Sequence, residues 1–338
     1  MAKKVSIKDI AAQLNISTTT VSFILNGKGK EKGISDVLTE RVLKYVKEIG
    51  YTTNQLAKSL RTGKTNIISL LIENIDDPFF SSVAGYVEAE ANQRGYKIIY
   101  GSTKNETDKT RELINLFKDR HVDGFIITPA EDMEVDIMKL KDEGIPFVLF
   151  DRYCESVQTD YVGMDNFESS RKAVDHLISQ NHKNIGFVTL NSDQSQMFDR
   201  LRGYEAAVSS HKLEAFIKKI DYSKVHQIAV KEITAFMNEN PQIDALFFAT
   251  SYLALKGLEV LNNLNLSIPD DVGLIAFDDH EIFKLYKPTI TAVTQPVAEM
   301  SKQLINLLLK QIDNDDISLQ QPKHIIVPSV INIRKSSA

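Results

Sequence analysis

Three acidic residues follow predicted strands and are the first candidates for ligand chemistry. Asp77 comes shortly after IISLLI, Asp151 directly follows FVLF, and Asp278 follows LIAF. In proteins built on parallel sheets, ligands bind at the carboxyl ends of the strands, which is where these three aspartates are expected to lie. Carboxylates there can accept hydrogen bonds from ligand hydroxyls, while Phe79 and Phe80 offer apolar ring faces. The combination suits a polyol; the alternative is that the two phenylalanines belong to the core.

These strands belong to a repeated pattern that begins at Asn66. Short runs that are apolar on both faces alternate with amphipathic helical stretches such as 110–119 and 169–180. The clearest runs are IISLLI, KIIYGS, GFIITPA, FVLFD, NIGFVTL, ALFFAT and GLIAFDD. The pattern is typical of doubly wound parallel sheets. We therefore predict an α/β body with two such sheets, arranged as two lobes with a ligand between them.

The N-terminal segment differs from this body in charge. Residues 1–64 contain twelve Lys and Arg against five Asp and Glu, a balance of +7, whereas the remainder carries −12. A small basic head on an acidic body predicts a polyanion partner for the head alone. The alternative is a soluble arm without a nucleic-acid role.

The head also has the pattern of three short helices. Ser6 with Asp9 resembles a capping box, Ser17 can cap a second helix over Thr18–Asn26, and Ser35 can cap a third that ends at Gly50. Apolar residues recur at helical spacing in each. Three such helices with a tight turn after the first form a helix-turn-helix module, whose second helix lies in the major groove.

The run IKDIAAQLNISTTTVSFILNG resembles the N-terminus of the Lac repressor family, and the similarity continues through IGYTTNQLAKSLRTGKT and the rest of the chain. The resemblance implies a DNA-binding domain at 1–52, a hinge helix and linker at 53–65, and an effector-binding body at 66–338. The body would be of the type I periplasmic-binding-protein kind. Its chain would cross between lobes near 163–165, 291–294 and 322–324. The N-lobe would hold 66–163 and 293–322, and the C-lobe 164–291 and 323–338.

The resemblance also assigns DNA contacts in the head. Thr18 and Thr19 would open the recognition helix and meet base edges, which threonine can read by its hydroxyl and its methyl group. The other polar residues assigned to DNA contacts, mainly with phosphates, are Ser6, Ser17, Thr20, Ser22 and Asn26.

Two features of the head depart from the family pattern. Phe23 stands where the family usually has Arg, so it cannot donate to guanine but can contact a thymine methyl. The loop 28–34 is about three residues longer than usual and adds Lys28, Lys30 and Lys32, which we interpret as phosphate contacts. The alternative for these lysines is a solvated loop. Operator sequences therefore do not carry over from relatives.

The sequence pattern of residues 54–61 predicts a helix of about two turns. This is shorter than the ~12–15 residues that an isolated helix needs to be stable in water. We expect it to form where DNA and a partner chain support it. By the resemblance, Leu60 would wedge between base steps in the minor groove, with Asn54, Ala57 and Arg61 beside it. The alternative is a plain interdomain linker.

The resemblance extends the set of effector-binding candidates in the body. Arg200 in RLRGY matches the family's R-x-x-G-aromatic, DDPFF resembles its NPFF, and Tyr222 matches an aromatic that packs on the ligand. The whole predicted set is Asp77, Phe79, Phe80, Asp151, Arg200, Tyr222, Thr250, Asp278 and Gln295. Thr250-Ser251 replaces an Asn-Asp pair that is common in relatives. The aromatic and charged residues favour a sugar, but the short hydroxyls at this pair leave a purine or another metabolite open.

The sequence gives little support for metal binding, nucleotide binding or a thiol nucleophile. The seven histidines are scattered, Gly63-Lys64-Thr65 lacks the earlier glycine of a P-loop, and no base lies near the single cysteine, Cys154. We predict no enzymatic activity, metal or cofactor. One cysteine fits a reducing compartment, and neither an apolar run of about 18 residues nor a secretory signal is visible. We expect a cytoplasmic, nucleoid-associated protein without a membrane partner.

These observations together predict a homodimeric repressor that binds a pseudo-palindromic operator and is controlled by a mono- or disaccharide. No leucine-heptad tail follows the last strand, so we expect a dimer rather than a dimer of dimers. A transport protein would predict a signal peptide and no basic head, and an enzyme would predict a catalytic constellation. Neither alternative matches the sequence.

Overall fold

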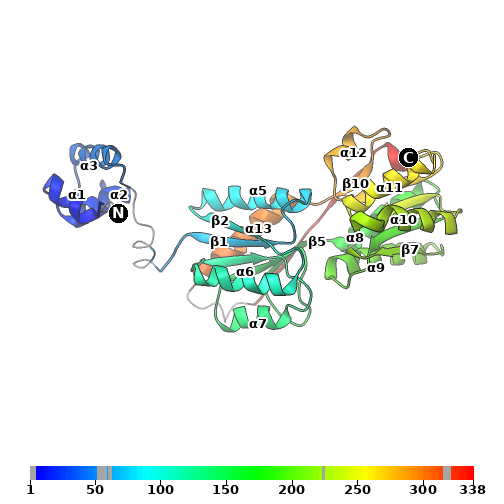
Figure 1. Cartoon of the computed structure of the whole chain (residues 1–338), viewed down its shortest axis with the longest axis horizontal. Coiled ribbons are helices and arrows are strands. Elements are labelled where there is room, and N and C mark those ends of the chain that lie inside the picture. The colour runs from blue at the N-terminus through cyan, green and yellow to red at the C-terminus, as the bar shows by residue number, and fades with distance from the viewer. Residues whose placement is uncertain (1–4, 52–58, 60–62, 223–224, 315–320) are drawn as a thin grey trace. The chain divides into compact units, whose positions relative to one another are not determined.

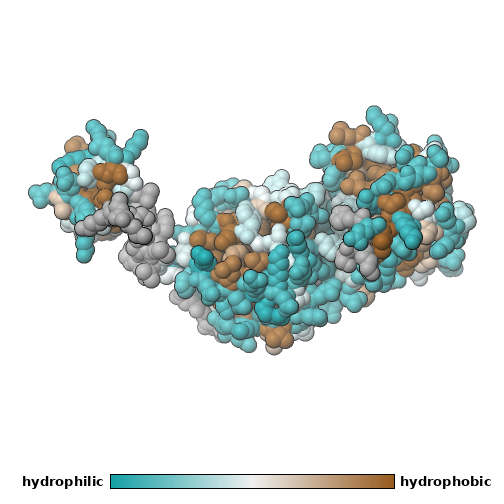
Figure 2. All heavy atoms as spheres, in the orientation of Figure 1, coloured by the Kyte–Doolittle hydropathy of each residue, from teal (hydrophilic) through white to brown (hydrophobic). Residues whose placement is uncertain are grey.

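The computed structural model describes residues 5–51, 59, 63–222, 225–314 and 321–338. Within it, 1–65 and 66–338 form two compact units, which are treated separately below. Among the described residues, no helix combines the length and apolar character needed to cross a bilayer. The visible face of the second unit is largely hydrophilic with interspersed hydrophobic areas (Figure 2).

The first unit contains the three predicted helices, α1 (Ile7–Leu14), α2 (Thr18–Leu25) and α3 (Asp36–Glu48). The Ser6 hydroxyl accepts from the Asp9 N–H, and the Asp9 carboxylate accepts from the Ser6 N–H at 2.8 Å, so the predicted capping box is present. Asn15 adopts φ 52° between α1 and α2, a left-handed conformation that Asn tolerates. Ile10, Val21 and Val42, one from each helix, are fully buried where the helices meet. The sequence pattern therefore predicted this unit well.

The second unit contains two six-stranded sheets, which define its two lobes (Figure 1). The N-lobe sheet has the order β11-β5-β4-β3-β1-β2, and all its strands are parallel. Its strands are β1 (Ile67–Ile72), β2 (Lys97–Ser102), β3 (Gly124–Ile127), β4 (Phe147–Phe150), β5 (Tyr161–Met164) and β11 (His324–Val327). Its helices are α5 (Pro78–Gln93), α6 (Thr107–Asp119), α7 (Glu134–Asp142) and α13 (Val297–Ile312). Figure 1 shows α5 and α13 on one side of this sheet and α6 and α7 on the other.

The C-lobe sheet has the order β12-β10-β9-β8-β6-β7, with β12 antiparallel to β10 at one edge. Its strands are β6 (Ile185–Leu190), β7 (Phe216–Ile220), β8 (Ala245–Phe248), β9 (Gly273–Phe277), β10 (Thr291–Thr294) and β12 (Val330–Asn332). Its helices are α8 (Asn166–Ser179), α9 (Ser195–Ser210), α10 (Val225–Glu239), α11 (Ser251–Asn263) and α12 (Glu281–Leu285), and a 3₁₀ turn, η3 (Lys335–Ser337), ends the chain. The two doubly wound sheets confirm the predicted fold class.

Two of the three chain crossings lie later than the sequence suggested. β10 pairs with β9 over Thr291–Val293 and with β12 up to Thr294, so the chain leaves the C-lobe only after Thr294, not within 291–294. β11 pairs with β5 in the N-lobe sheet, His324 opposite Tyr161, so residues 324–327 belong to the N-lobe and not to the C-lobe. The third crossing therefore falls at Pro328–Ser329. Strand pairing across more than 150 residues decides this assignment, and a local pattern cannot show it.

Candidate functional site

The exposed side of α2 carries the predicted DNA-reading residues. Val21 and Ile24 turn into the core of the head, while Thr18, Thr19 and Asn26 are exposed and Ser22 and Phe23 are half-buried. The Ser17 hydroxyl accepts from the Thr20 N–H at 3.0 Å and lies 2.8 Å from the Thr20 hydroxyl. Ser17 and Ser6 therefore both serve as helix caps, and each remains exposed enough to reach a phosphate.

The lengthened loop after α2 is folded against the head. The Ile34 N–H donates to the Gly29 carbonyl at 2.9 Å, and Gly29 is buried against α3, where an added Cβ would lie 3.1 Å from the Thr39 hydroxyl. This packing brings the Lys32 ammonium to 5.7 Å from the centroid of the Phe23 ring. Lys28, Lys30 and Lys32 are all exposed. The loop thus places positive charge beside the atypical reading residue.

The remaining DNA-contact predictions concern the hinge. Asn54, Ala57, Leu60 and Arg61 lie outside the described residues, so their roles stay predictions.

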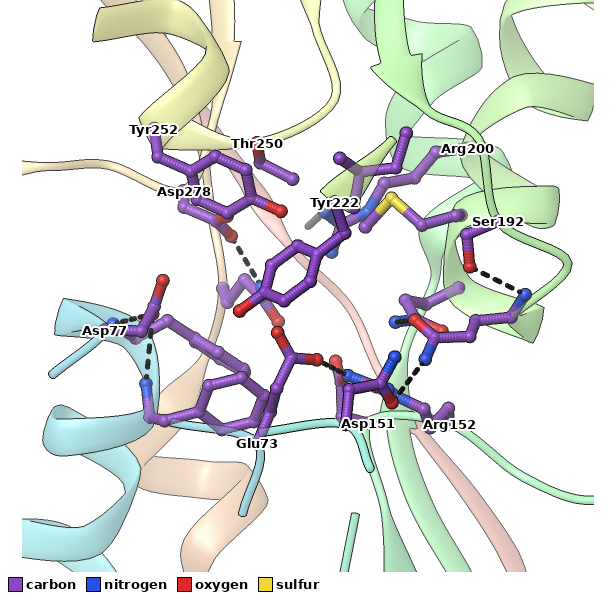
Figure 3. Close-up of a pocket in the computed structure, with 18 of the residues that line it drawn as sticks. Glu73, Asp77, Asp151, Arg152, Ser192, Arg200, Tyr222, Thr250, Tyr252 and Asp278 are labelled. Carbon is purple, nitrogen blue, oxygen red and sulfur yellow. Dashed lines mark hydrogen bonds and ion pairs between the residues drawn. The ribbon is translucent and has the colours of Figure 1, made fainter. Parts of the chain in front are cut away.

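The nine predicted effector residues all line one cavity between the lobes of the body (Figure 3). The cavity holds about 640 Å³ of empty space, part of it continuous with solvent. Asp151 and Asp278, directly after β4 and β9, both have positive φ, 67° and 65°. Non-glycine residues with such angles gather at functional sites because the surrounding structure must hold them there.

The N-lobe side of the cavity begins at the start of α5. The Asp77 carboxylate caps this helix and accepts from the Phe79 N–H at 2.8 Å. The Phe79 ring stacks on Phe150 with a centroid distance of 5.9 Å. Phe80 is 6% exposed and belongs mainly to the hydrophobic core, although it also reaches the cavity. Phe79 therefore provides the accessible ring face on this side.

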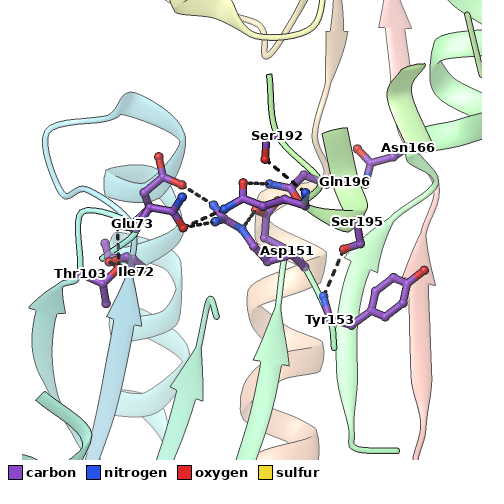
Figure 4. A network of polar contacts seen from close by, with 12 residues as sticks. Ile72, Glu73, Thr103, Asp151, Tyr153, Asn166, Ser192, Ser195 and Gln196 are labelled. Carbon is purple, nitrogen blue, oxygen red and sulfur yellow. Dashed lines mark hydrogen bonds and ion pairs between the residues drawn. The ribbon is translucent and has the colours of Figure 1, made fainter. Parts of the chain in front are cut away.

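A network of polar contacts around Arg152 forms part of the cavity lining (Figure 4). Arg152 is 4% exposed; it forms an ion pair with Glu73 and donates to the Asn105 side-chain oxygen at 2.8 Å. The Gln194 amide of the C-lobe donates to the same Asn105 oxygen at 2.8 Å, so the network joins the two lobes. The Nε atom of Arg152 also lies 3.5 Å from the Asp151 carboxylate.

Burial dominates the electrostatics of this network. It raises the pKa of Asp151, and the nearby Arg152 and Arg200 offset that effect only in part. Burial by itself lowers the pKa of Arg152, but the carboxylates of Glu73 and Asp151 raise it above its ordinary value. Arg152 therefore stays charged and holds the network together, because the buried carboxylates of Glu73 and Asp151 would be costly to leave unpaired.

The C-lobe side of the cavity is built around Arg200, which is 2% exposed. Its guanidinium donates to the Asn166 side chain at 2.9 Å and to the Ala249 carbonyl at 2.7 Å. It also lies 3.7 Å above the centroid of the Phe277 ring, a cation–π arrangement. These three contacts fix Arg200 in one orientation at the cavity wall.

Asp278 and Thr250 occupy neighbouring strand ends on the same side. The Gln295 amide donates to the Asp278 carboxylate at 2.6 Å. The buried Thr250 side chain caps α11 and accepts from the Leu253 N–H at 3.4 Å. A helix-capping role for Thr250 leaves less of its hydroxyl for a ligand than the sequence suggested.

Two tyrosines complete the cavity. The Tyr222 and Tyr252 rings meet edge to face with a centroid distance of 6.4 Å, and both line the cavity together with Glu73 of the opposite lobe. Burial and then the charge of Glu73 raise the pKa of Tyr222. An aromatic wall thus faces the carboxylates of the N-lobe.

The Asp77 carboxylate has a strongly raised pKa. Burial and then the negative charge of Asp278 on the other lobe raise this pKa to about 6, although the N–H groups of Phe79 and Phe80 act in the opposite direction. Two carboxylates, one from each lobe, therefore line the same cavity.

Comparisons with known proteins agree with this architecture. The model of the bacterial regulatory proteins of the lacI family matches residues 6–54, and that of the periplasmic binding protein-like domain matches residues 174–337. The HTH-type transcriptional repressor PurR of Haemophilus influenzae (strain PittEE) is 27% identical over 341 residues, covering 98% of each chain. The chain belongs to the lacI family of bacterial regulatory proteins.

Solved structures share the fold of this lacI-family protein over its full length. The Lac repressor dimer bound to operator and an anti-inducer gives a TM-score of 0.86 at 18% identity, covering 99% of each chain. The complex of the transcriptional regulator CelR with cellobiose gives a TM-score of 0.71 at 23% identity, covering 98% of this chain and 99% of the other. The lacI-family match and the PurR relative, rather than these structures, confirm the predicted function of a DNA-binding transcription regulator.

Sequence reasoning missed several cavity residues of this lacI-family protein. Glu73 follows β1, Arg152 follows Asp151, and Asn191 follows β6, so the rule that found the three aspartates could have found them. Asn105, Gln194 and Tyr252 lie in a loop, before a helix and within a helix, where no comparable signal exists.

The structure offers no support for metal or thiol chemistry. Within the described ranges, His, Cys, Asp and Glu nowhere gather in a group of three that could hold a metal ion. Cys154 is buried, and burial raises the pKa of its thiol to about 12, which leaves it unreactive at neutral pH.

Proposed function

We propose that this lacI-family regulator binds a pseudo-palindromic operator as a homodimer, and that a mono- or disaccharide in the cavity between its lobes controls operator affinity. The observation that carries the proposal is the cavity itself. Residues from both lobes contribute ring faces, carboxylates and buried arginines to one cavity. A sugar offers C–H faces and hydroxyls that match both kinds of group.

The head supports the DNA-binding half of the proposal. In our interpretation Thr18 and Thr19 contact base edges, Phe23 contacts a thymine methyl, and Lys28 contacts a phosphate. The other proposed head contacts are Ser6, Ser17, Thr20, Ser22 and Asn26. For the hinge, we propose that Leu60 enters the minor groove with Asn54, Ala57 and Arg61 around it. Helix-turn-helix dimers match two half-sites, which is why we infer a homodimer, and such a regulator acts at the nucleoid in the cytoplasm.

The coupling between the two halves follows from the contacts that cross the cavity. Gln194 of the C-lobe donates to Asn105 of the N-lobe, and the Tyr153 N–H of the N-lobe donates to the Ser195 hydroxyl of the C-lobe. A ligand that touches both lobes must compete with or add to these contacts and thereby shifts the preferred lobe orientation. Couplings of this type are about 1–3 kcal/mol, or roughly 5- to 150-fold in affinity. We infer that the shift reaches DNA through the hinge.

Fluorescence anisotropy with a selected operator tests the proposal on the full-length chain. We expect at least one sugar to stabilise the body thermally and to change operator affinity at least fivefold. The double variant Thr18→Ala/Thr19→Ala should lose sequence-specific binding and keep ligand stabilisation, whereas Val37→Ala, at an exposed position of α3, should change neither. A ligand that stabilises the body but leaves operator affinity unchanged would refute the coupling.

A further inference from the structure

Most of the arginine and glutamine donors of the effector cavity already have acceptors in the protein, although the Arg152 Nε atom has no hydrogen-bond partner among the described residues. Arg152 donates to Glu73 and Asn105, and Arg200 donates to acceptors of its own lobe. The Gln295 amide N–H₂ faces Asp278. A ligand that depended on strong donors from the protein would have to displace these contacts.

Two buried acceptors of the cavity have no hydrogen-bond partner in the described ranges. Gln295 is 8% exposed and Gln196 is 4% exposed, and the side-chain oxygen of each has no hydrogen-bond partner among the described residues. The Gln295 amide cannot simply be reversed, because its N–H₂ must face the Asp278 carboxylate. Burying an unpaired carbonyl is costly, so these oxygens are set for a donor that arrives with the ligand.

Asp77 and Asp278 add two further acceptors. One oxygen of Asp77 accepts both N–H groups at the start of α5, and one oxygen of Asp278 accepts from Gln295. Within the described part of the chain, the second oxygen of each carboxylate accepts no hydrogen bond. Figure 3 shows both side chains at the cavity, one from each lobe.

The excess of acidic over basic residues in the cavity lining also favours a cationic ligand. Its titratable acids are Glu73, Asp77, Glu131, Asp151 and Asp278, and its bases are Arg152 and Arg200. The mutual repulsion of Asp77 and Asp278 is visible in the raised pKa of Asp77. An anionic ligand would add to this repulsion, while a cation would remove it.

We propose that the effector carries a protonated amino group that binds between Asp77 and Asp278 and against the free oxygen of Gln295, so its class is an amino sugar. An ammonium group has three donors and no acceptor, which matches three acceptors without partners. A sugar hydroxyl donates once and leaves both carboxylate charges uncompensated. The inference rests on the proposed effector site and specifies its ligand.

Matched pairs of ligands test this inference on the full-length protein by titration calorimetry at pH 7.5. The pairs are glucosamine with glucose, galactosamine with galactose, and mannosamine with mannose, each with its neutral N-acetyl derivative. We expect at least one amine to bind about tenfold more tightly than its neutral parent, the difference between charged and neutral hydrogen bonds. The N-acetyl derivative should lose that advantage.

Two variants identify the residues responsible. Asp278→Asn keeps an acceptor for Gln295, and Asp77→Asn keeps a helix cap, so both should fold. Each should reduce the preference for the amine severalfold, while Asp119→Asn, at an exposed position of α6, should leave it unchanged.

The outcomes separate this inference from the proposed function. Equal or tighter binding of the neutral parent, a preference that survives both variants, or no binding by any amine would overturn the amino-sugar class. If neutral sugars then still change operator affinity, the proposed function stands without it. If no mono- or disaccharide changes operator affinity in the anisotropy assay, the proposed function itself fails.

Discussion

Replacing Asp77 by Asn should stabilise the body, and by more at neutral than at acidic pH. The folded body raises the pKa of Asp77 to about 6 from an ordinary value of 3.8. Between pH 4 and 6 the folded body therefore binds this proton more tightly than the unfolded chain does. The stability contributed by the proton is lost as the pH rises through that range.

The magnitude follows from the size of the pKa change. At about 1.36 kcal/mol per pH unit, ionised Asp77 costs the fold roughly 3 kcal/mol at pH 7.5. About half of this cost already applies at pH 5, because the unfolded carboxylate is then largely ionised. The advantage of Asp77→Asn should thus grow by roughly 1.5 kcal/mol between pH 5 and pH 7.5. For a domain of this size that is about 3–6 °C in melting temperature.

Thermal unfolding of the wild type and the variant at a series of pH values between 5 and 8 measures this difference. Asn can cap α5 as Asp does, so the change isolates the charge. Asp119→Asn, at an exposed position, serves as the control and should give no pH-dependent difference. An advantage that is constant with pH, or that shrinks as the pH rises, would refute the reasoning.

Three further outcomes are expected. Phe23→Arg should shift binding-site selection toward guanine at one position, by about 1–3 kcal/mol, without changing the circular dichroism of the head; an unchanged site would show that Phe23 does not read DNA. Gly203→Ala should lower the melting temperature, since its Cβ would lie 2.3 Å from the Phe167 carbonyl oxygen, whereas Gly85→Ala, with open space around it, should not. Arg200→Met should destabilise the body by about 2 kcal/mol or more in thermal unfolding, because two buried acceptors lose a charged donor. It should also lower ligand affinity at least tenfold in calorimetry, because Arg200 lines the cavity and only two of its three guanidinium nitrogens have acceptors among the described residues. Unchanged affinity would place Arg200 outside the ligand's reach.

Much of the fold could be predicted because its signals are local. The capping box of Ser6 and Asp9 spans three residues, and a buried parallel strand shows itself as a short apolar run. Asp151 and Asp278 could be named because they follow such runs directly. All nine predicted effector residues line one cavity; their ligand remains a proposal.

Other parts of the site had no local signal. Asn105 and Gln194 are ordinary polar residues in sequence, and only the approach of the two lobes makes them the link between them. The Thr250 hydroxyl, predicted as a ligand contact, lines the cavity and also caps α11, a second role that the sequence analysis did not assign to it. Hydrogen bonds between distant residues depend on the tertiary structure, not on the types of neighbouring residues.

The sequence by itself determined the basic head, its three helices, the alternation of strands and helices, and the acidic strand ends. These follow from charge and periodicity, which act over a few residues. Only the tertiary structure decided that β11 joins the N-lobe sheet and that Asp77 and Asp278 line the same cavity. Strand pairing and electrostatic repulsion act through space, so they are settled only when segments from both ends of the body are brought together.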